Sequence, residues 1–247
     1  MELLDVREYV FLIHIGTYPR HLNAGGFVID KDGYLGTGFF IAKNGLGMTA
    51  AHCLPEPDSI EDKSVCAGVW DGKFLRAHKI LSFIKWPKFD IAVIEVENVT
   101  PKYLRLSFES LSLGADVFTI GIPLHSLRGE GLEVRLLKGH VVSGDRFLEL
   151  SFAAPRGMSG SPLFRGDEVV GVISGNARSE SLEDQVEEIV ELTDQKELIR
   201  IIETKSVINY GLAEQLTPLR DARHKVFGDH TFQQLIDHVN TRNERAS

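Results

Sequence analysis

The stretch that decides the fold spans residues 36–53 and reads Gly-Thr-Gly-Phe-Phe-Ile-Ala-Lys-Asn-Gly-Leu-Gly-Met-Thr-Ala-Ala-His-Cys. Its first part, residues 37–41, is rich in the aromatic and β-branched side chains that strands favour. The dipeptide Asn44-Gly45, a strong signal for a hairpin turn, separates it from a second apolar part that leads to His52. The stretch therefore predicts two strands joined by a tight turn, with a histidine directly after them.

Similar short apolar runs continue along the first two-thirds of the chain. Turn signals such as Asp32-Gly33 and Asp71-Gly72 lie between them, and no helical pattern separates them. Many closely spaced short strands predict a mostly β fold, either a sandwich or a barrel. The expected strands are residues 9–16, 26–29, 37–41, 89–96, 116–120, 132–137, 147–152 and 169–174.

The last third of the chain has a different pattern. Apolar residues recur at helical spacing from 182 to 202 after a capping box formed by Ser181 and Asp184, which predicts an inserted helix over about 181–204. We expect a further strand over residues 206–212 and two C-terminal helices over residues 216–227 and 232–239. Residues 97–114 are the best candidate for a seam between two halves, 1–108 and 109–247.

The composition is that of an ordinary globular protein with an acidic balance. The 27 Lys and Arg residues against 35 Asp and Glu residues give a net charge of −8, so we expect no broad basic surface and no nucleic-acid partner. No run of residues approaches the roughly 20 apolar positions of a membrane span. The N-terminal apolar run, residues 9–15, follows acidic residues rather than the positive segment of a signal peptide. We therefore expect a cytoplasmic protein with no membrane partner.

Two cysteines, Cys53 and Cys66, stand too far apart for a metal-binding motif such as Cys-x-x-Cys. A secreted domain that depends on disulfides would carry more cysteines. We interpret both as small buried hydrophobic residues with free thiols, and we expect neither a metal nor an organic cofactor.

Three segments hold residues that together could break an amide bond. His52 ends the first segment, Asp90 lies in Phe-Asp-Ile-Ala-Val-Ile at 89–94, and Ser159 lies in Pro-Arg-Gly-Met-Ser-Gly-Ser-Pro-Leu at 155–163. Hydrolysis through a covalent intermediate needs a hydroxyl, a base, an acceptor that fixes the tautomer of the base, and N–H donors for the oxyanion. Ser, His and Asp supply the first three. Gly157 offers a backbone N–H that no Cβ obstructs.

These segments resemble the three signature regions of trypsin-like serine proteases with the chymotrypsin fold, in that family's order of His, Asp and Ser. The likeness covers roughly residues 9–221 and is greatest to bacterial HtrA-type members. It implies two antiparallel β-barrels with the active site in the cleft between them. The first barrel would carry His52 and Asp90, and the second would carry Ser159.

The resemblance also implies a role for each site residue. His52 becomes the general base and acid, Asp90 the carboxylate that orients it, and Ser159 the nucleophile. The backbone N–H groups of Gly157 and Ser159 become the oxyanion hole. We therefore expect a bacterial serine endopeptidase that cleaves a protein or peptide substrate through an acyl-enzyme.

The substrate-binding residues follow from the same resemblance. The base of the primary pocket falls at Ala153 with Ala154 beside it, Asn176 lines the wall, and Ser174 supports the Asp and pairs with the substrate backbone. A small uncharged pocket predicts cleavage after Ala, Val or Leu. An acid from the inserted helix, such as Glu180 or Glu183, would instead restore a preference for Lys or Arg.

The sequence departs from the family pattern at several positions. Leu35 stands where secreted animal members have the disulfide partner of the cysteine after the catalytic His. Met158 stands where animal members have an Asp that pairs with a freed N-terminus, so activation by N-terminal trimming is not expected. No PDZ-like segment follows the protease-like region, so we expect no complete HtrA architecture.

Two other functions remain open from the sequence. A degenerate protease would use the cleft for binding without cutting, although all three triad positions are filled. An α/β-hydrolase would use Ser159 with Asp194 and His224, but Ser161 stands where its motif needs Gly. A dedicated partner protein or a self-inhibited state would restrain a cytoplasmic protease. The sequence does not predict the oligomeric state.

Overall fold

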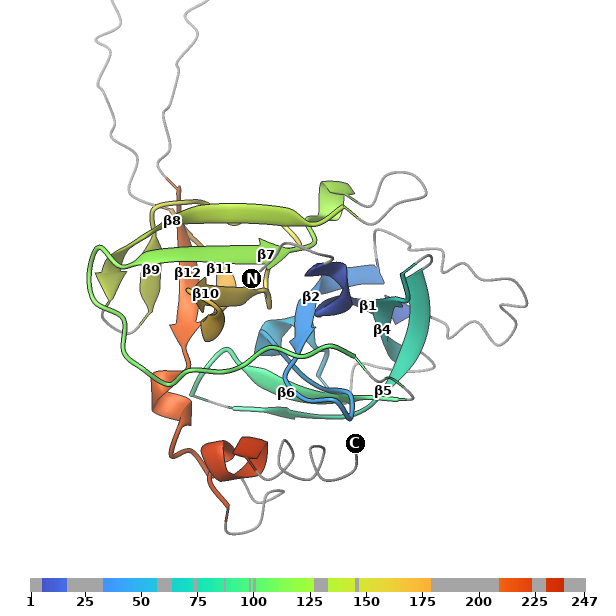
Figure 1. Ribbon diagram of the computed structural model, residues 1–247. Coiled ribbons are helices and arrows are strands. Elements are labelled where there is room, and N and C mark those ends of the chain that lie inside the picture. Colours follow the sequence, from blue (N-terminus) through green and yellow to red (C-terminus); the bar gives the residue numbers. More distant parts are fainter. Residues whose placement is uncertain are drawn as a thin grey trace, which may run out of the picture.

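The computed structural model describes residues 6–16, 33–56, 64–72, 75–86, 88–97, 99, 101–126, 133–144, 147–178, 209–223 and 230–237. These residues form two closed six-stranded barrels that lie side by side (Figure 1). All the strand pairings within both barrels are antiparallel. The mostly β fold with two antiparallel barrels expected from the sequence is confirmed.

The first barrel closes in the strand order β1-β2-β3-β6-β5-β4. Its strands are β1 (Val10–Gly16), β2 (Tyr34–Phe40), β3 (Leu46–Thr49), β4 (Ser64–Trp70), β5 (Leu75–Lys85) and β6 (Ala92–Val96). The Asn44-Gly45 turn joins β2 to β3 as expected, and Gly38 pairs with Thr49 across the hairpin. Gly38 has no room for a side chain, since a Cβ there would lie 2.2 Å from the Phe11 ring.

The second barrel closes in the order β10-β11-β12-β9-β8-β7. Its strands are β7 (Asp116–Gly121), β8 (Arg135–Gly144), β9 (Leu148–Leu150), β10 (Pro162–Arg165), β11 (Glu168–Arg178) and β12 (Asn209–Gln215). The connection from β6 to β7 bonds to both barrels. Leu104 N–H donates to Phe40 O at 2.9 Å, and Ser107 N–H donates to Val169 O at 2.8 Å. The seam predicted at residues 97–114 thus lies in this connection.

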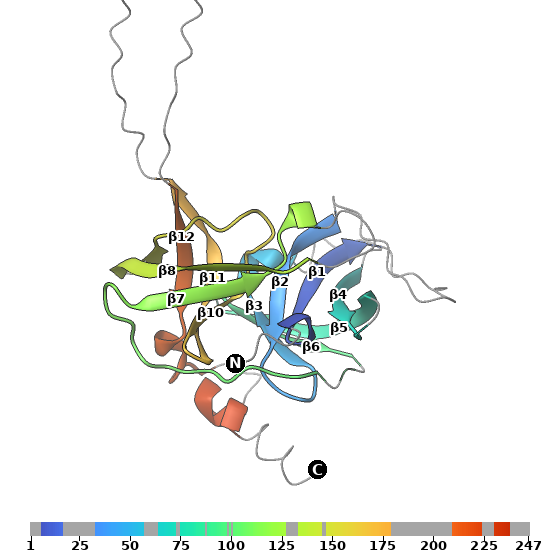
Figure 2. The same ribbon diagram turned by 45° about the horizontal axis from the view of Figure 1, so that its top comes forward.

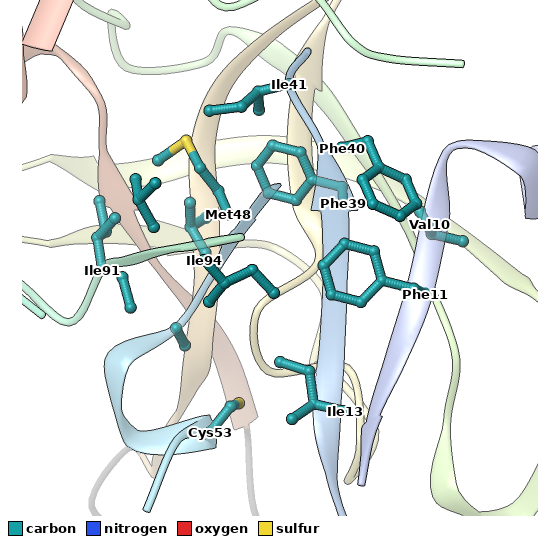
Figure 3. Close-up of a cluster of buried hydrophobic side chains, with 14 of the residues drawn as sticks. Val10, Phe11, Ile13, Phe39, Phe40, Ile41, Met48, Cys53, Ile91 and Ile94 are labelled. Carbon is teal, nitrogen blue, oxygen red and sulfur yellow. The ribbon is translucent and has the colours of Figure 1, made fainter. Parts of the chain in front are cut away.

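Buried aromatic and aliphatic side chains fill the first barrel (Figure 3). Phe11, Phe39 and Phe40 are fully buried, and burying a side chain of this size contributes roughly 1.5–3 kcal/mol each. Cys53 lies at the end of the same cluster and is 1% exposed. Both cysteines are buried and free, as expected, and burial raises the pKa of the Cys66 thiol.

The C-terminal segment packs against the first barrel although it follows the second. Residues 232–237 are helical, which agrees with the expected helix over 232–239. Phe232 is fully buried, and its ring meets that of Trp86 edge to face, with centroids 5.4 Å apart. The segment therefore carries the chain from the last strand of the second barrel onto the core of the first.

The expected helix over 216–227 is wrong for its described part. Only Thr217–Leu219 form a short 3-10 helix, η6. Ala222 O then accepts a hydrogen bond from Phe232 N–H at 2.9 Å, and Arg223 forms a β-bridge with Thr231. The chain must reverse to make these contacts, so a helix cannot continue through residue 223.

The expected strand over 26–29 and the expected helix over about 181–204 lie outside the described residues, as do Glu180 and Glu183. Within the described part of the chain, no helix is long and apolar enough to cross a membrane.

Candidate active site

Three short segments place the predicted catalytic side chains on the facing edges of the two barrels. His52 lies in the 3-10 helix η3 (Ala51–Cys53) directly after β3, and Asp90 lies in the turn before β6. Ser159 lies in the turn before β10. β2 runs along the side of the first barrel that faces the second, and Thr37 N–H donates to Ser159 O at 2.8 Å (Figure 2). That bond holds the Ser159 turn against the first barrel.

The Asp90 carboxylate holds His52 at two points. Oδ2 lies 2.6 Å from ring Nδ1, and Oδ1 accepts the His52 backbone N–H at 2.9 Å. The His52 side chain is 48% exposed, against 26% for Asp90, so the carboxylate is the more sheltered partner. The two contacts fix the ring orientation and put the Nδ1 proton on the Asp side, which leaves Nε2 to act as base.

The same hydrogen bond changes the acidity of the ring. The bond to Asp90, with a smaller contribution from Cys53 Sγ at 3.8 Å from Nε2, raises the pKa of His52 from 6.5 to about 10. Partial burial opposes this shift and is outweighed. The imidazolium form is thus strongly favoured by its surroundings.

Ser159 is partly buried and close to this pair. Cys53 Sγ donates to Ser159 O at 3.5 Å, so the cysteine lies between the histidine ring and the serine turn. Among the described residues, no hydrogen bond joins Ser159 Oγ to His52 Nε2. Catalytic hydrogen bonds are often long before substrate binds and tighten in the complex.

Residues 155–161, called here the oxyanion loop, form successive tight turns around Ser159. Met158 N–H donates to Pro155 O and Ser161 N–H to Met158 O, both at 3.0 Å. Within the described structure, the N–H groups of Gly157 and Ser159 bond to no other group, as an oxyanion site requires. Gly157 has φ +97°, in the region that favours glycine.

The residues expected to form the primary pocket are brought together only in part. Ala154 is buried and Ala153 is exposed, so Ala153 does not close the base of a buried pocket. Asn176 makes two hydrogen bonds to Ala154, since its Oδ1 accepts the backbone N–H and its Nδ2 donates to the carbonyl oxygen, both at 2.7 Å. The carboxamide therefore ties β11 to the segment that precedes the Ser159 turn.

A residue that the sequence did not single out supports Asp90. Glu214 of β12 is 4% exposed, and its Oε1 accepts the Asp90 backbone N–H at 3.1 Å. No hydrogen bond from Ser174 to Asp90 occurs in the described residues, although Ser174 lines the same groove. The only available signal was an acidic residue within the apolar run that ends at Leu216.

A groove of about 510 Å³ runs beside the His52–Asp90 pair. Its walls combine apolar and charged side chains from both barrels. In the part of the chain that is described, no three His, Cys, Asp or Glu side chains gather to hold a metal. The groove is lined by Ala51, His52, Glu56, Lys85, Trp86, Lys88, Phe89, Asp90, Phe147, Ser174, Leu212 and Glu214.

Comparison with known sequences identifies a family. The trypsin-like peptidase domain family matches residues 36–172. A probable periplasmic serine endoprotease, DegP-like, from Pseudomonas fulva is 28% identical over 173 residues, which are 68% of this chain and 34% of that protein. A protein of the same description from Halomonas elongata is 31% identical over 151 residues, 57% of this chain and 29% of that protein. The chain thus spans about a third of the length of these curated relatives.

Solved structures show the same fold. The Rv3671c protease from M. tuberculosis in its active form aligns with a TM-score of 0.54 at 19% identity, covering 85% of this chain and 76% of the other. Neuropsin, a serine protease of mouse brain, aligns with a TM-score of 0.53 at 12% identity, covering 86% and 91%.

Proposed function

Because the chain belongs to the trypsin-like peptidase domain family, we propose that it is a serine endopeptidase that cleaves protein or peptide substrates with His52, Asp90 and Ser159. The observation that carries the proposal is the double contact of Asp90 with His52, beside a serine turn whose Gly157 and Ser159 N–H groups bond to nothing among the described residues. These groups are what acyl transfer requires.

In the proposed reaction, Ser159 Oγ attacks the carbonyl carbon of the scissile bond while its proton passes to His52 Nε2. The carbonyl π electrons move to oxygen, and the N–H groups of Gly157 and Ser159 stabilise that oxyanion. Collapse breaks the C–N bond, and the leaving amine takes the proton from His52. Water then attacks the acyl carbon while His52 takes its proton. The C–O bond to Ser159 breaks, His52 returns that proton to Ser159 Oγ, and the acid product leaves.

A second candidate function is a binding module that uses the groove without cutting. The absence of a Ser159–His52 hydrogen bond within the described structure favours it. The α/β-hydrolase alternative has no such support, because two closed antiparallel barrels lack its alternating strands and helices.

Cleavage of an unfolded protein separates the two candidates. We expect the chain to cut β-casein into peptides that mass spectrometry identifies, and the Ser159→Ala variant to leave it intact. Binding of casein by both forms, with no new peptides from either, would establish the binding module.

We predict that activity rises on the alkaline side of pH 6.5. His52 must be neutral to accept the Ser159 proton, and the bond to Asp90 raises its pKa, so the neutral form needs a higher pH than free imidazole does. The profile of kcat/KM should have its midpoint above pH 7. Circular dichroism over the same range separates this effect from unfolding. A midpoint at or below pH 6.5 contradicts the shift, and a flat profile contradicts the role of His52 as base.

We predict cleavage after small apolar residues, because the resemblance assigns the primary pocket to the small, uncharged Ala153 and Ala154, and Asn176 is held against Ala154 by two hydrogen bonds. Each extra methylene that a pocket cannot hold costs about 1–3 kcal/mol of transition-state binding, or roughly 10–200-fold in kcat/KM. A peptide library varied at the residue before the cut should therefore favour Ala, Val or Leu. Asn176→Gly should raise cleavage after Phe by about tenfold or more. If the parent protein cuts the library peptides mainly after Lys or Arg, the prediction of an uncharged pocket is wrong.

The substrate, a dedicated partner and the cytoplasmic location stay predictions. The two curated relatives are described as probable periplasmic proteins, and that description applies to them.

A further inference from the structure

The side-chain hydroxyls of Tyr34 and Thr37, both on β2, form a buried hydrogen-bond network with the oxyanion loop. Thr37 Oγ1 accepts Ile122 N–H at 3.1 Å and donates to Gly157 O at 2.9 Å. Tyr34 Oη lies within hydrogen-bond distance of both Ile122 O and Gly157 O. Since Thr37 supplies a proton to Gly157, the single Tyr34 proton is available for Ile122 O.

Each of the two peptide planes that flank Gly157 is held by a hydrogen bond at its carbonyl. The plane of Gly157 and Met158 is held at its carbonyl by Thr37. The plane of Arg156 and Gly157 is held at its carbonyl by Leu124 N–H at 2.8 Å. In a trans peptide the C=O and N–H groups point in opposite directions, so this second bond turns Gly157 N–H away from Leu124.

Gly157 needs such restraints because glycine rotates readily about φ and ψ. Its surroundings admit no other residue, since a Cβ would lie 2.6 Å from both Leu124 N and Tyr34 Cε1. Ile122, which Thr37 and Tyr34 bond at its N–H and its carbonyl, lies two residues before Leu124, so the same hydroxyls anchor the segment that supplies the second restraint.

The neighbouring residue offers no charged restraint. Met158 is fully buried in the core of the second barrel, at the position where the family resemblance places an ion-pairing Asp in animal enzymes. The Tyr34 phenol is a stable donor, because burial raises its pKa above its usual value.

The geometry points to Tyr34 and Thr37 as positioning residues that keep Gly157 N–H aimed at the developing oxyanion, in place of an ion pair at Met158. This inference rests on the proposed peptidase function for its consequence, but the orientation of Gly157 can be measured without any turnover.

The first experiment measures turnover in matched variants. Thr37→Val removes the hydroxyl, Thr37→Ser keeps it, and Tyr34→Phe removes the second hydroxyl. Thr119→Val is the control, since Thr119 is also fully buried and donates to a carbonyl, Pro162 O, at 2.8 Å.

Loss of an oxyanion donor costs about 10²–10³ in kcat, and a loosened donor should cost less. We expect Thr37→Val to lower kcat about 10–100-fold with KM within about threefold, and Thr37→Ser to restore it. Tyr34→Phe should lower kcat less than Thr37→Val, and Thr119→Val should change it little.

The second experiment observes Gly157 directly. Labelling the full chain with ¹³C′-arginine and ¹⁵N-glycine leaves three Arg-Gly signals, from residues 128–129, 156–157 and 165–166. We expect the Gly157 amide signal to shift or broaden in Thr37→Val and to keep its position in Thr37→Ser and Thr119→Val.

An unchanged Gly157 signal in both Thr37→Val and Tyr34→Phe overturns the inference, whether or not the protein is active. Equal losses of kcat in Thr37→Val and Thr119→Val also overturn it. A parent protein that cuts nothing while its Gly157 signal responds to Thr37→Val contradicts the proposed function and leaves the positioning role supported.

Discussion

Replacing Ser159 by alanine is expected to lower kcat by about 10⁶, which is the loss found when the nucleophilic serine of another serine protease is removed. The variant keeps the oxyanion donors and the groove, so a residual rate above that of the uncatalysed reaction should remain. The measurement is steady-state cleavage of a peptide that the parent protein cuts.

Ser161→Ala is the matched control for this prediction. Ser161 lies two residues further along the same loop, is fully buried, and has an Oγ without a hydrogen-bond partner among the described residues. Removing that hydroxyl breaks no hydrogen bond there, so we expect nearly unchanged kcat. Comparable losses in the two variants would mean that the serine effect is one of loop packing and not of nucleophilic attack.

Asp90→Asn is expected to lower kcat by about 10⁴ with little change in KM. The amide that replaces Oδ2 presents an N–H to Nδ1, so the ring takes the tautomer whose Nε2 carries the proton and cannot act as base. The protein should stay folded, because an amide oxygen can still accept the His52 backbone N–H.

Asp116→Asn provides the control for this change. Asp116 Oδ1 lies 3.1 Å from His140 Nδ1, and both of these side chains are well exposed on the second barrel. The substitution thus alters a second His–carboxylate contact, whose two residues do not line the groove, and kcat should be unaffected. If Asp90→Asn keeps more than about a tenth of the parent kcat, the orienting role of Asp90 is wrong.

The sequence identified the strands that carry the site better than those that complete the barrels. The Asn44-Gly45 hairpin and the apolar run after Asp90 have strong local signals, and β2, β3 and β6 lie there. β4 and β5 were missed, although Asp71-Gly72 marked the turn between them. In β5 (Leu75–Lys85) the alternation of apolar and polar residues breaks at His78-Lys79 and again at Ile80-Leu81, so the pattern gave no strand signal.

The missed features of the site all depend on contacts between distant segments. Glu214 meets Asp90 across 124 residues, and Thr37 meets Gly157 across 120. No local pattern shows that a threonine in a strand faces a carbonyl of the other barrel. The helix expected over residues 216–227 was wrong in its described part, 216–223, for the same reason, because Phe232 packs on Trp86 and requires the chain to turn back first.

The central claim is that Ser159 is a nucleophile activated by His52, and a fluorophosphonate probe tests it most directly. Attack by Ser159 Oγ displaces fluoride and leaves a stable phosphonyl ester, so the reaction needs an active serine but no knowledge of the substrate. We predict one adduct per chain, located on Ser159 by peptide mapping, absent from Ser159→Ala and much slower to form in His52→Ala. A folded parent protein that gains no adduct, or that carries it on another residue, would contradict the account.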